Sequence, residues 1–145
     1  MIKMGCDIHA FIEVKFGGAW HYYGELKVGR DYELFERMAG VRGYKSAAML
    51  PPRGLPEDAG AMTVFIKNDW GSDGHSHSWF SAVEMEALDA WHKKRFLSHE
   101  RPASVFTRQP ETLYLFGNDI DSWWRWPRER PKGVEDIRLV FWFDN

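Results

Sequence analysis

The sequence predicts a single α+β domain over residues 1–145, with a largely antiparallel sheet and two main helices. Three observations lead to this fold class. Apolar and polar residues alternate near both ends of the chain, as they do in half-buried strands. Two segments between these ends carry apolar residues at helical spacing behind an N-cap residue. No repeat, low-complexity tract or linker divides the chain.

Composition narrows the class of protein. The chain has 145 residues, of which 44% are hydrophobic and 28% are charged, and this balance is typical of a globular domain with a core. A net charge of −2 argues against a protein that coats nucleic acid by bulk electrostatics. With one cysteine, no signal peptide and no membrane-length apolar run, we expect a cytoplasmic protein that does not enter membranes.

The first predicted strand runs from Cys6 to Phe16, because its apolar and polar residues alternate. Gly17-Gly18 then predicts a hairpin turn, and Ala19–Tyr23 returns as the second strand. A C-terminal strand is predicted at Ile137–Phe143, which alternates in the same way. We expect the hairpin and this strand to share one sheet.

Two helices are predicted from their ends. Asp31 has the character of an N-cap and Gly40 that of the residue that ends the helix. Ser81 and Glu84 have the spacing of a capping box, and the helix that follows is expected to reach Leu97.

The segments between these elements are less regular. Val41–Gly60 is rich in Gly and Pro and predicts an ordered loop, which in a compact domain is often functional. The short apolar run Met62–Lys67 predicts a strand, and Thr112–Phe116 a further one.

Two residue pairs are candidate metal ligands. Asp7 and His9 are two apart on the first strand, so a carboxylate and an imidazole project to the same side. His75 and His77 have the same spacing in an extended segment just before a helix. We predict that these four side chains converge on a divalent metal ion. The alternative is that the two histidines satisfy backbone groups at the helix start.

Three more carboxylates are candidate additional ligands: Asp73, Asp119 and Asp144. Each is also an ordinary turn or terminal residue. Asp144 would reach the same end of the sheet as Asp7 only if the last strand lies beside the first. Cys6, next to Asp7, is a candidate nucleophile, although a buried and inert cysteine is the commoner case.

Aromatic residues make up 16% of the chain, including eight Trp, and serve either as large core side chains or as a stacking surface for a base or sugar. A Trp next to an Arg in a loop is typical of a site that binds a base and its phosphate. The candidate phosphate- or nucleotide-binding residues are Arg53, Trp123, Arg125 and Arg128.

Three fragments resemble ligand motifs of the calcineurin-like phosphoesterases: Asp7-Ile8-His9, Gly74-His75-Ser76-His77 and Gly117-Asn118-Asp119-Ile120-Asp121. The order of the last two is reversed relative to that family. The resemblance therefore implies metal ligands of a similar kind rather than membership of that family.

A second resemblance spans the chain in patches. The segments MGCDIH (residues 4–9), PRGLP (52–56), HSHSW (75–79) and VFWFDN (140–145) are similar to those of small phage and prophage proteins. This resemblance implies a viral or prophage setting, in the cytoplasm of a host cell, and by analogy a role against host defence. It carries over no catalytic residue.

Two functions from different classes follow. The first is a metal-dependent hydrolase of a phosphodiester or nucleotide, in which the metal activates water. The second is a non-catalytic nucleotide-binding sponge, or an inhibitor of a host protein, that uses a Trp/Arg pocket. The hydrolase and the sponge both imply a small nucleotide or phosphodiester as the ligand, whereas the inhibitor implies a host protein as the partner. Self-association of the chain into a homo-oligomer is compatible with each of these functions.

Overall fold

A four-stranded sheet forms the centre of the fold. A computed structural model of the chain describes residues 5–98, 115–116, 123 and 127–144. These residues contain one antiparallel sheet with the strand order β2-β1-β4-β3, so the N-terminal hairpin and the C-terminal strand share a sheet, as predicted. The α+β fold class is thereby confirmed. The strands are β1 (Asp7–Phe16), β2 (Ala19–Leu26), β3 (Gly74–Ser81) and β4 (Val134–Asp144).

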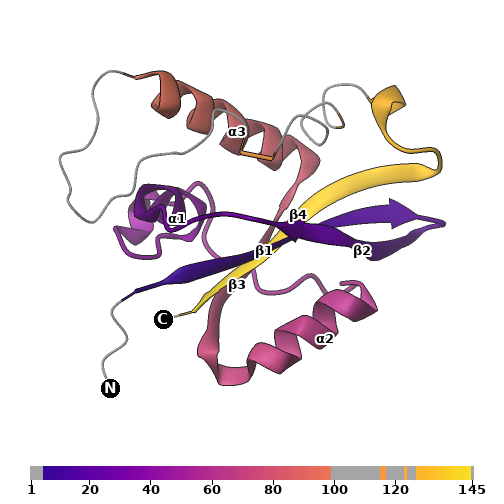
Figure 1. The fold of residues 1–145 in the computed structure, drawn as a ribbon, viewed down its shortest axis with the longest axis horizontal. Coiled ribbons are helices and arrows are strands. Elements are labelled where there is room, and N and C mark those ends of the chain that lie inside the picture. Colours follow the sequence, from indigo (N-terminus) through magenta and orange to yellow (C-terminus); the bar gives the residue numbers. More distant parts are fainter. Residues whose placement is uncertain (1–4, 99–114, 117–122, 124–126, 145) are drawn as a thin grey trace.

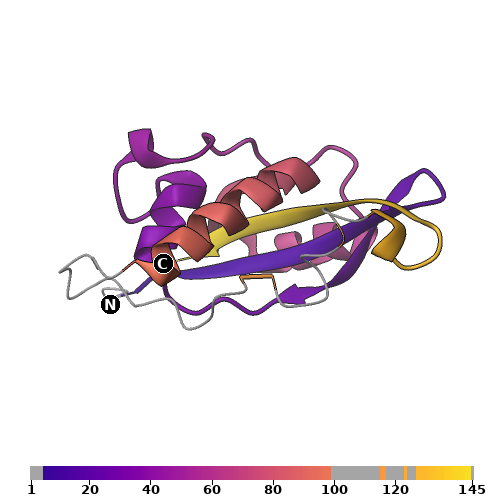
Figure 2. The same ribbon diagram turned by 90° about the horizontal axis from the view of Figure 1, so that it is seen from above.

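Helices cover both faces of the sheet (Figure 1). α1 (Tyr32–Ala39) and α3 (Ala82–Leu97) lie on the face toward the viewer in Figure 2, and α2 (Ala61–Trp70) lies on the other face. The alternation along β1 decides which helix each side chain meets. Ile12 belongs to the core under α1 and α3, whereas Phe11 packs with Ile66 and Trp70 of α2.

The central strand β4 is buried on both sides. Every residue from Ile137 to Phe143 is at most 4% exposed. Phe141 and Phe143 pack under α1 and α3, and Val140 and Trp142 pack under α2. Burying a large apolar side chain contributes about 1.5–3 kcal/mol, so this strand supplies much of the hydrophobic stabilisation.

α1 begins and ends where its capping residues predict. The Asp31 side chain accepts a hydrogen bond from the backbone N–H of Leu34, and Gly40 has a φ of 72°, the left-handed conformation that favours glycine. Asp31 also receives two hydrogen bonds from Arg95, at 2.6 and 2.8 Å. This buried pair joins the start of α1 to the end of α3.

α3 begins with the predicted capping box. The Ser81 side chain accepts from the backbone N–H of Glu84, and the Glu84 side chain accepts from the backbone N–H of Ser81. The helix continues to Leu97, as expected, and packs Met85 and Leu88 onto the sheet.

The predicted strand Met62–Lys67 is wrong, because this segment is the middle of helix α2. A six-residue apolar run has no period that separates a strand from a helix. The helix is also capped from a distance: Gly60, at its N-cap, has no side chain, and Glu13 of β1 accepts from Gly60 N (2.8 Å) and Thr63 Oγ1 (2.6 Å) instead.

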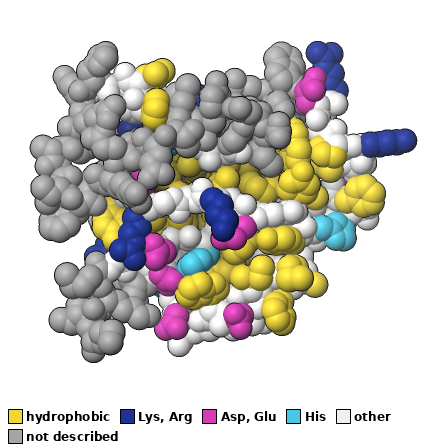
Figure 3. Space-filling model, in the orientation of Figure 1, with side chains coloured by type: hydrophobic (Ala, Val, Ile, Leu, Met, Phe, Trp, Pro, Cys, Tyr) yellow, Lys and Arg dark blue, Asp and Glu magenta, His cyan; other side chains and the backbone are white. Residues whose placement is uncertain are grey.

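Apolar side chains gather on the surface of α2 and β2 (Figure 3). Met62 and Phe65 of α2 are 53% and 68% exposed, and Tyr23 of β2 is 51% exposed. Among the described residues, no helix has the length and apolar character needed to cross a membrane.

The predicted strand Thr112–Phe116 lies mostly outside the described residues. Its last two residues, Leu115 and Phe116, are described as a turn and are buried in the core under α1 and α3.

Candidate functional site

His75 and His77 lie on β3, as the expected extended segment requires, but they do not share a face. Their rings lie 6.3 Å from Phe143 and 5.6 Å from Trp142, respectively, two neighbours on β4 that point to opposite sides of the sheet. The cause is Ser76, whose φ of 55° interrupts the strand where the β3–β4 register shifts. The expectation that both imidazoles project to one side is therefore corrected.

His9 and Asp144 are in contact at one end of the sheet. Because β4 pairs with β1, Asp144 lies opposite Asp7, and its carboxylate lies 2.9 Å from His9 Nε2. Trp70 of α2 packs on the His9 ring, with centroids 4.0 Å apart. Asp144, one of the additional carboxylates predicted, thus contacts His9 at this end of the sheet.

The Asp7 carboxylate is held by an arginine. Arg30 donates two hydrogen bonds to it, at 2.8 and 3.2 Å. This contact holds the pKa of Asp7 below its usual range. Its oxygens are consequently already occupied by a cation.

No metal-ligand cluster is formed by the described residues: nowhere do three His, Cys, Asp or Glu side chains gather closely enough to hold an ion. Asp73 ends a turn of 3-10 helix just before β3, and Asp119 lies outside the described residues. The described part of the chain thus brings His9 and Asp144 together but not the predicted set of four.

His77 is partly buried on the α2 side of the sheet. Its Nε2 atom is inaccessible to solvent and has no hydrogen-bond partner among the described residues. Burial lowers the pKa of His77, so the ring is held in its neutral form.

Arg53 lies in a cavity of about 640 Å³ beside two tryptophans. Its guanidinium stacks on Trp79 at 3.9 Å, and Arg138 stacks on Trp20 at 4.0 Å. This is the predicted association of Trp with Arg, at other tryptophans than the one expected.

Both arginines of this cavity are neutralised. Arg53 contacts Glu84 at 2.6 Å, and Arg138 contacts Glu13 at 2.7 Å and Asp58 at 2.9 Å. Glu57, Asp58 and Asp136 also line the cavity. An anionic ligand would meet opposing carboxylates here, which weighs against Arg53 as a phosphate-binding residue.

Of the other predicted nucleotide-binding residues, one lies in the core, one is exposed and one lies outside the described residues. Trp123 is 6% exposed and belongs to the core, so its expected stacking role is corrected. Arg128 lies in an exposed turn of 3-10 helix, Pro127–Glu129, and Arg125 lies outside the described residues.

A basic cavity of about 390 Å³ lies between the end of α1, the loop that follows it and the start of β3. Arg42, Lys45, His75 and Ser76 supply its polar side chains, and none of its described lining residues is acidic. Among the described residues, no carboxylate lies within ion-pair distance of the exposed Arg42 or Lys45. These two cations are therefore not neutralised by a carboxylate in the described part of the chain.

The backbone of this cavity is strained. Arg42 and Ser76 have φ values of 60° and 55°, and in the described residues they are the two non-glycine positions with positive φ. Such a conformation costs about 1–2 kcal/mol per residue and is concentrated at functional sites. Both strained residues line the same cavity.

Cys6 lies beside Arg42 but does not gain reactivity from it. The thiol is fully buried, and its desolvation raises the pKa of Cys6, although the nearby Arg42 charge acts in the opposite direction. The cysteine is thus held as a thiol, in agreement with the inert alternative.

The site around Arg42 was missed by reasoning from motifs, although His75 was named for another role. The signal that pointed to it was the Gly/Pro-rich loop Val41–Gly60, which carries Arg42 and Lys45.

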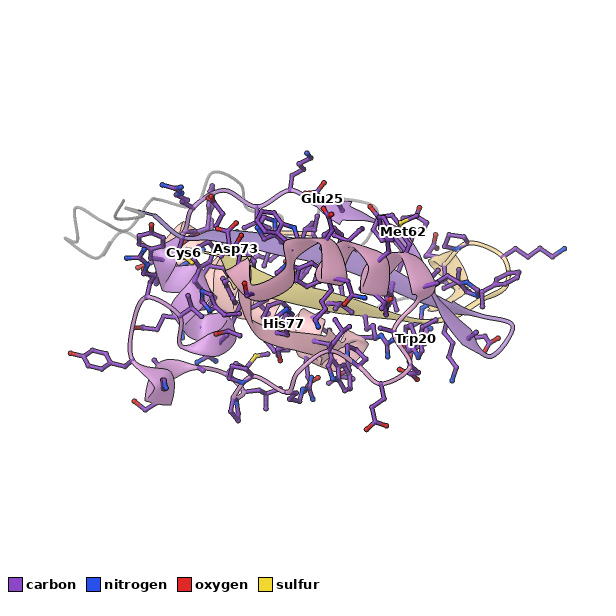
Figure 4. All side chains as sticks on the ribbon, turned by 90° about the horizontal axis from the view of Figure 1, so that it is seen from below. Cys6, Trp20, Glu25, Met62, Asp73 and His77 are labelled. Carbon is purple, nitrogen blue, oxygen red and sulfur yellow. The ribbon has the colours of Figure 1, made fainter. Side chains whose placement is uncertain are left out.

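The basic cavity and the cavity at Arg53 lie far apart. Figure 4 shows that Cys6, which lies beside Arg42, and Trp20, which lines the cavity at Arg53, lie toward opposite ends of the molecule. The two cavities are therefore separate sites.

Comparison of the chain with protein-family models, with curated proteins and with solved structures finds no significant match. The function is therefore inferred from the geometry of the described residues.

Proposed function

We propose that the protein binds a small phosphate ester of the nucleotide class in the cavity at Arg42. The observation that carries the proposal is the pair of exposed cations, Arg42 and Lys45, which line one cavity and have no carboxylate partner in the described residues. Elsewhere in the described part, the two arginines of the cavity at Arg53, Arg53 and Arg138, are paired with carboxylates.

The chemistry of the cavity suits a phosphate. A guanidinium can donate two parallel hydrogen bonds to phosphate oxygens, and an ammonium adds a point charge. The Ser76 hydroxyl and the His75 ring lie at the same cavity and add hydrogen-bonding groups. The protein as a whole has a net charge of −2, so this positive site contrasts with its surroundings.

The size of the cavity also fits. Sites for small ligands are typically about 300–1,000 Å³, and this one is about 390 Å³. The strain at Arg42 and Ser76 supports the same site, since a backbone held in a costly conformation places side chains before the ligand arrives.

The metal-dependent hydrolysis of such a ligand remains a prediction. Its support among the described residues is the contact between His9 and Asp144, and a divalent ion would need further ligands there. Binding at Arg42 does not depend on this metal.

The test is titration calorimetry with inorganic pyrophosphate and ribose 5-phosphate, at low salt. Replacing Arg42 and Lys45 together by Gln should weaken the affinity at least 100-fold, because each charge-assisted hydrogen bond contributes about 1.5–3 kcal/mol. Lys27→Gln is the matched control, since Lys27 is an exposed cation at the end of β2 whose partner is Glu25. No binding by the wild type, or equal binding by the double variant, would contradict the proposal.

A further inference from the structure

A second cavity adjoins the phosphate site. It has a volume of about 440 Å³, lies between α1 and α3, and shares Arg42 with the basic cavity. A ligand held by Arg42 can therefore extend into either space. Its other described lining residues are Tyr32, Glu33, Glu36, Arg37, Ala47 and Trp91.

The two cavities differ in charge. The described lining of the basic cavity has cations without carboxylates, whereas the second cavity balances Glu33 and Glu36 against Arg37 and Arg42. A ligand that lies across Arg42 is thus expected to have an anionic end and an uncharged end. Nucleoside phosphates have this distribution of charge.

Trp91 of α3 gives the second cavity an aromatic wall. It is partly exposed, and the Arg95 guanidinium lies 4.6 Å from the centre of its ring. Bases stack on tryptophan rings and on arginine planes, and Arg42 already lies against Tyr32 in such an arrangement, at 5.3 Å. The wall and the shared arginine therefore provide flat surfaces for a base.

Glu33 provides hydrogen-bond acceptors in the same space. In the described part of the chain its ion-pair partner is Arg95, at a long 3.9 Å, and desolvation raises the pKa of Glu33. A half-buried carboxylate with so weak a partner gains from N–H donors on a ligand. Glu36 is already engaged, because its Oε2 accepts from the backbone N–H of Tyr44 and so holds the loop that carries Arg42.

We infer that the second cavity holds the base of a nucleotide whose phosphate lies at Arg42 and Lys45, and that guanine is the preferred base. Guanine presents two adjacent N–H donors on one edge, which a single carboxylate such as Glu33 can accept together. Uracil presents one donor between two acceptors. This inference depends on the proposed phosphate site and adds the identity of the base.

The experiment measures dissociation constants for pyrophosphate, ribose 5-phosphate, GMP and UMP. The wild type should bind GMP at least tenfold more tightly than ribose 5-phosphate, because stacking of one base commonly contributes a factor of this size or more. Trp91→Leu should remove this advantage, and Glu33→Gln should reduce the preference for GMP over UMP. Both variants should bind pyrophosphate like the wild type, which also shows that they are folded.

The outcomes of this experiment test the base site and the phosphate site separately. Equal affinities for GMP, UMP and ribose 5-phosphate, with pyrophosphate binding intact, would overturn the base site and leave the phosphate site standing. Loss of pyrophosphate binding in Trp91→Leu, with a wild-type thermal melt, would also overturn it, because the ring would then act on the phosphate site. Failure of the wild type to bind pyrophosphate and all three phosphate esters would overturn the phosphate site itself.

Discussion

Replacing Glu13 by Gln tests whether one buried carboxylate joins β1, β4 and α2. The Glu13 side chain is 0% exposed and contacts Arg138 of β4 at 2.7 Å. Its other oxygen accepts from Gly60 N and Thr63 Oγ1 at the start of α2. Among the described residues, no other side chain caps this helix at its N-cap position, which is Gly60.

The loss of unfolding free energy expected for Glu13→Gln follows from these contacts. Breaking a buried ion pair by removing one partner costs about 3–5 kcal/mol, because the other charge stays buried. Arg138 retains Asp58, whose side chain is 69% exposed, so the lower end of this range applies. Weakening of the cap adds about 1 kcal/mol. We expect Glu13→Gln to lower the free energy of unfolding by about 3–4 kcal/mol.

The assay is equilibrium unfolding in urea, followed by tryptophan fluorescence. Asp58→Asn is the matched control, since it removes the exposed partner of the same arginine and should cost about 1 kcal/mol or less. The melting temperature of Glu13→Gln should fall by about 6–16 °C, at about 2–4 °C per kcal/mol for a domain near this size.

A double variant tests the electrostatic reason. Adding Arg138→Met to Glu13→Gln should cost less than the sum of the two single changes, because it removes the unpaired buried charge. If Glu13→Gln is no more harmful than Asp58→Asn, or if the two single effects simply add, the argument from the buried charge is refuted.

Three further predictions concern other parts of the molecule. Ser81→Ala should destabilise the protein by about 1 kcal/mol in urea unfolding, because it removes half of the capping box of α3; a neutral result would show that Glu84 alone suffices. The pKa of Glu33 is raised in the folded state, so its desolvation cost is absent at low pH and grows as the pH rises from the unfolded pKa through the folded one. Glu33→Gln should therefore stabilise the protein more at pH 7 than at pH 4, and a pH-independent effect in urea unfolding would count against this. If the predicted metal ion is bound at His9 and Asp144, a chelator should lower the melting temperature of the wild type and leave His9→Ala unaffected, whereas an unchanged wild-type melt would contradict the metal.

Local patterns were sufficient where each structural element carries its own signal. Alternation in β1 predicted a strand correctly, but the strand is buried on both faces rather than half-buried, because α2 covers the side on which Phe11 lies. Asp31 and Ser81 predicted the starts of two helices, because a cap lies within three residues of the groups that it satisfies. These features depend on neighbours in the chain, and neighbours are visible in the sequence.

The same reasoning failed where the partner is distant or the backbone departs from its period. α2 was mistaken for a strand in part because its capping carboxylate, Glu13, precedes Gly60 by 47 residues. His75 and His77 were expected to share a face, but the positive φ of Ser76 separates them. A spacing of two residues predicts one face only while the strand stays regular.

The sequence by itself determined the N-terminal hairpin, the C-terminal strand, the two capped helices and a composition typical of a globular domain, whereas the strand order and the place of β3 came from the tertiary structure. Tertiary structure decided the candidate site. Arg42 and Lys45 follow α1, His75 begins β3, and only the packing of these segments brings them to one cavity. Packing also decided which cations remain available: Arg53 and Arg138 meet carboxylates that are distant in the sequence, whereas Arg42 and Lys45 meet none in the described residues. The physical reason is that the charge a ligand experiences depends on which groups lie close in space, and separation along the chain does not set that distance.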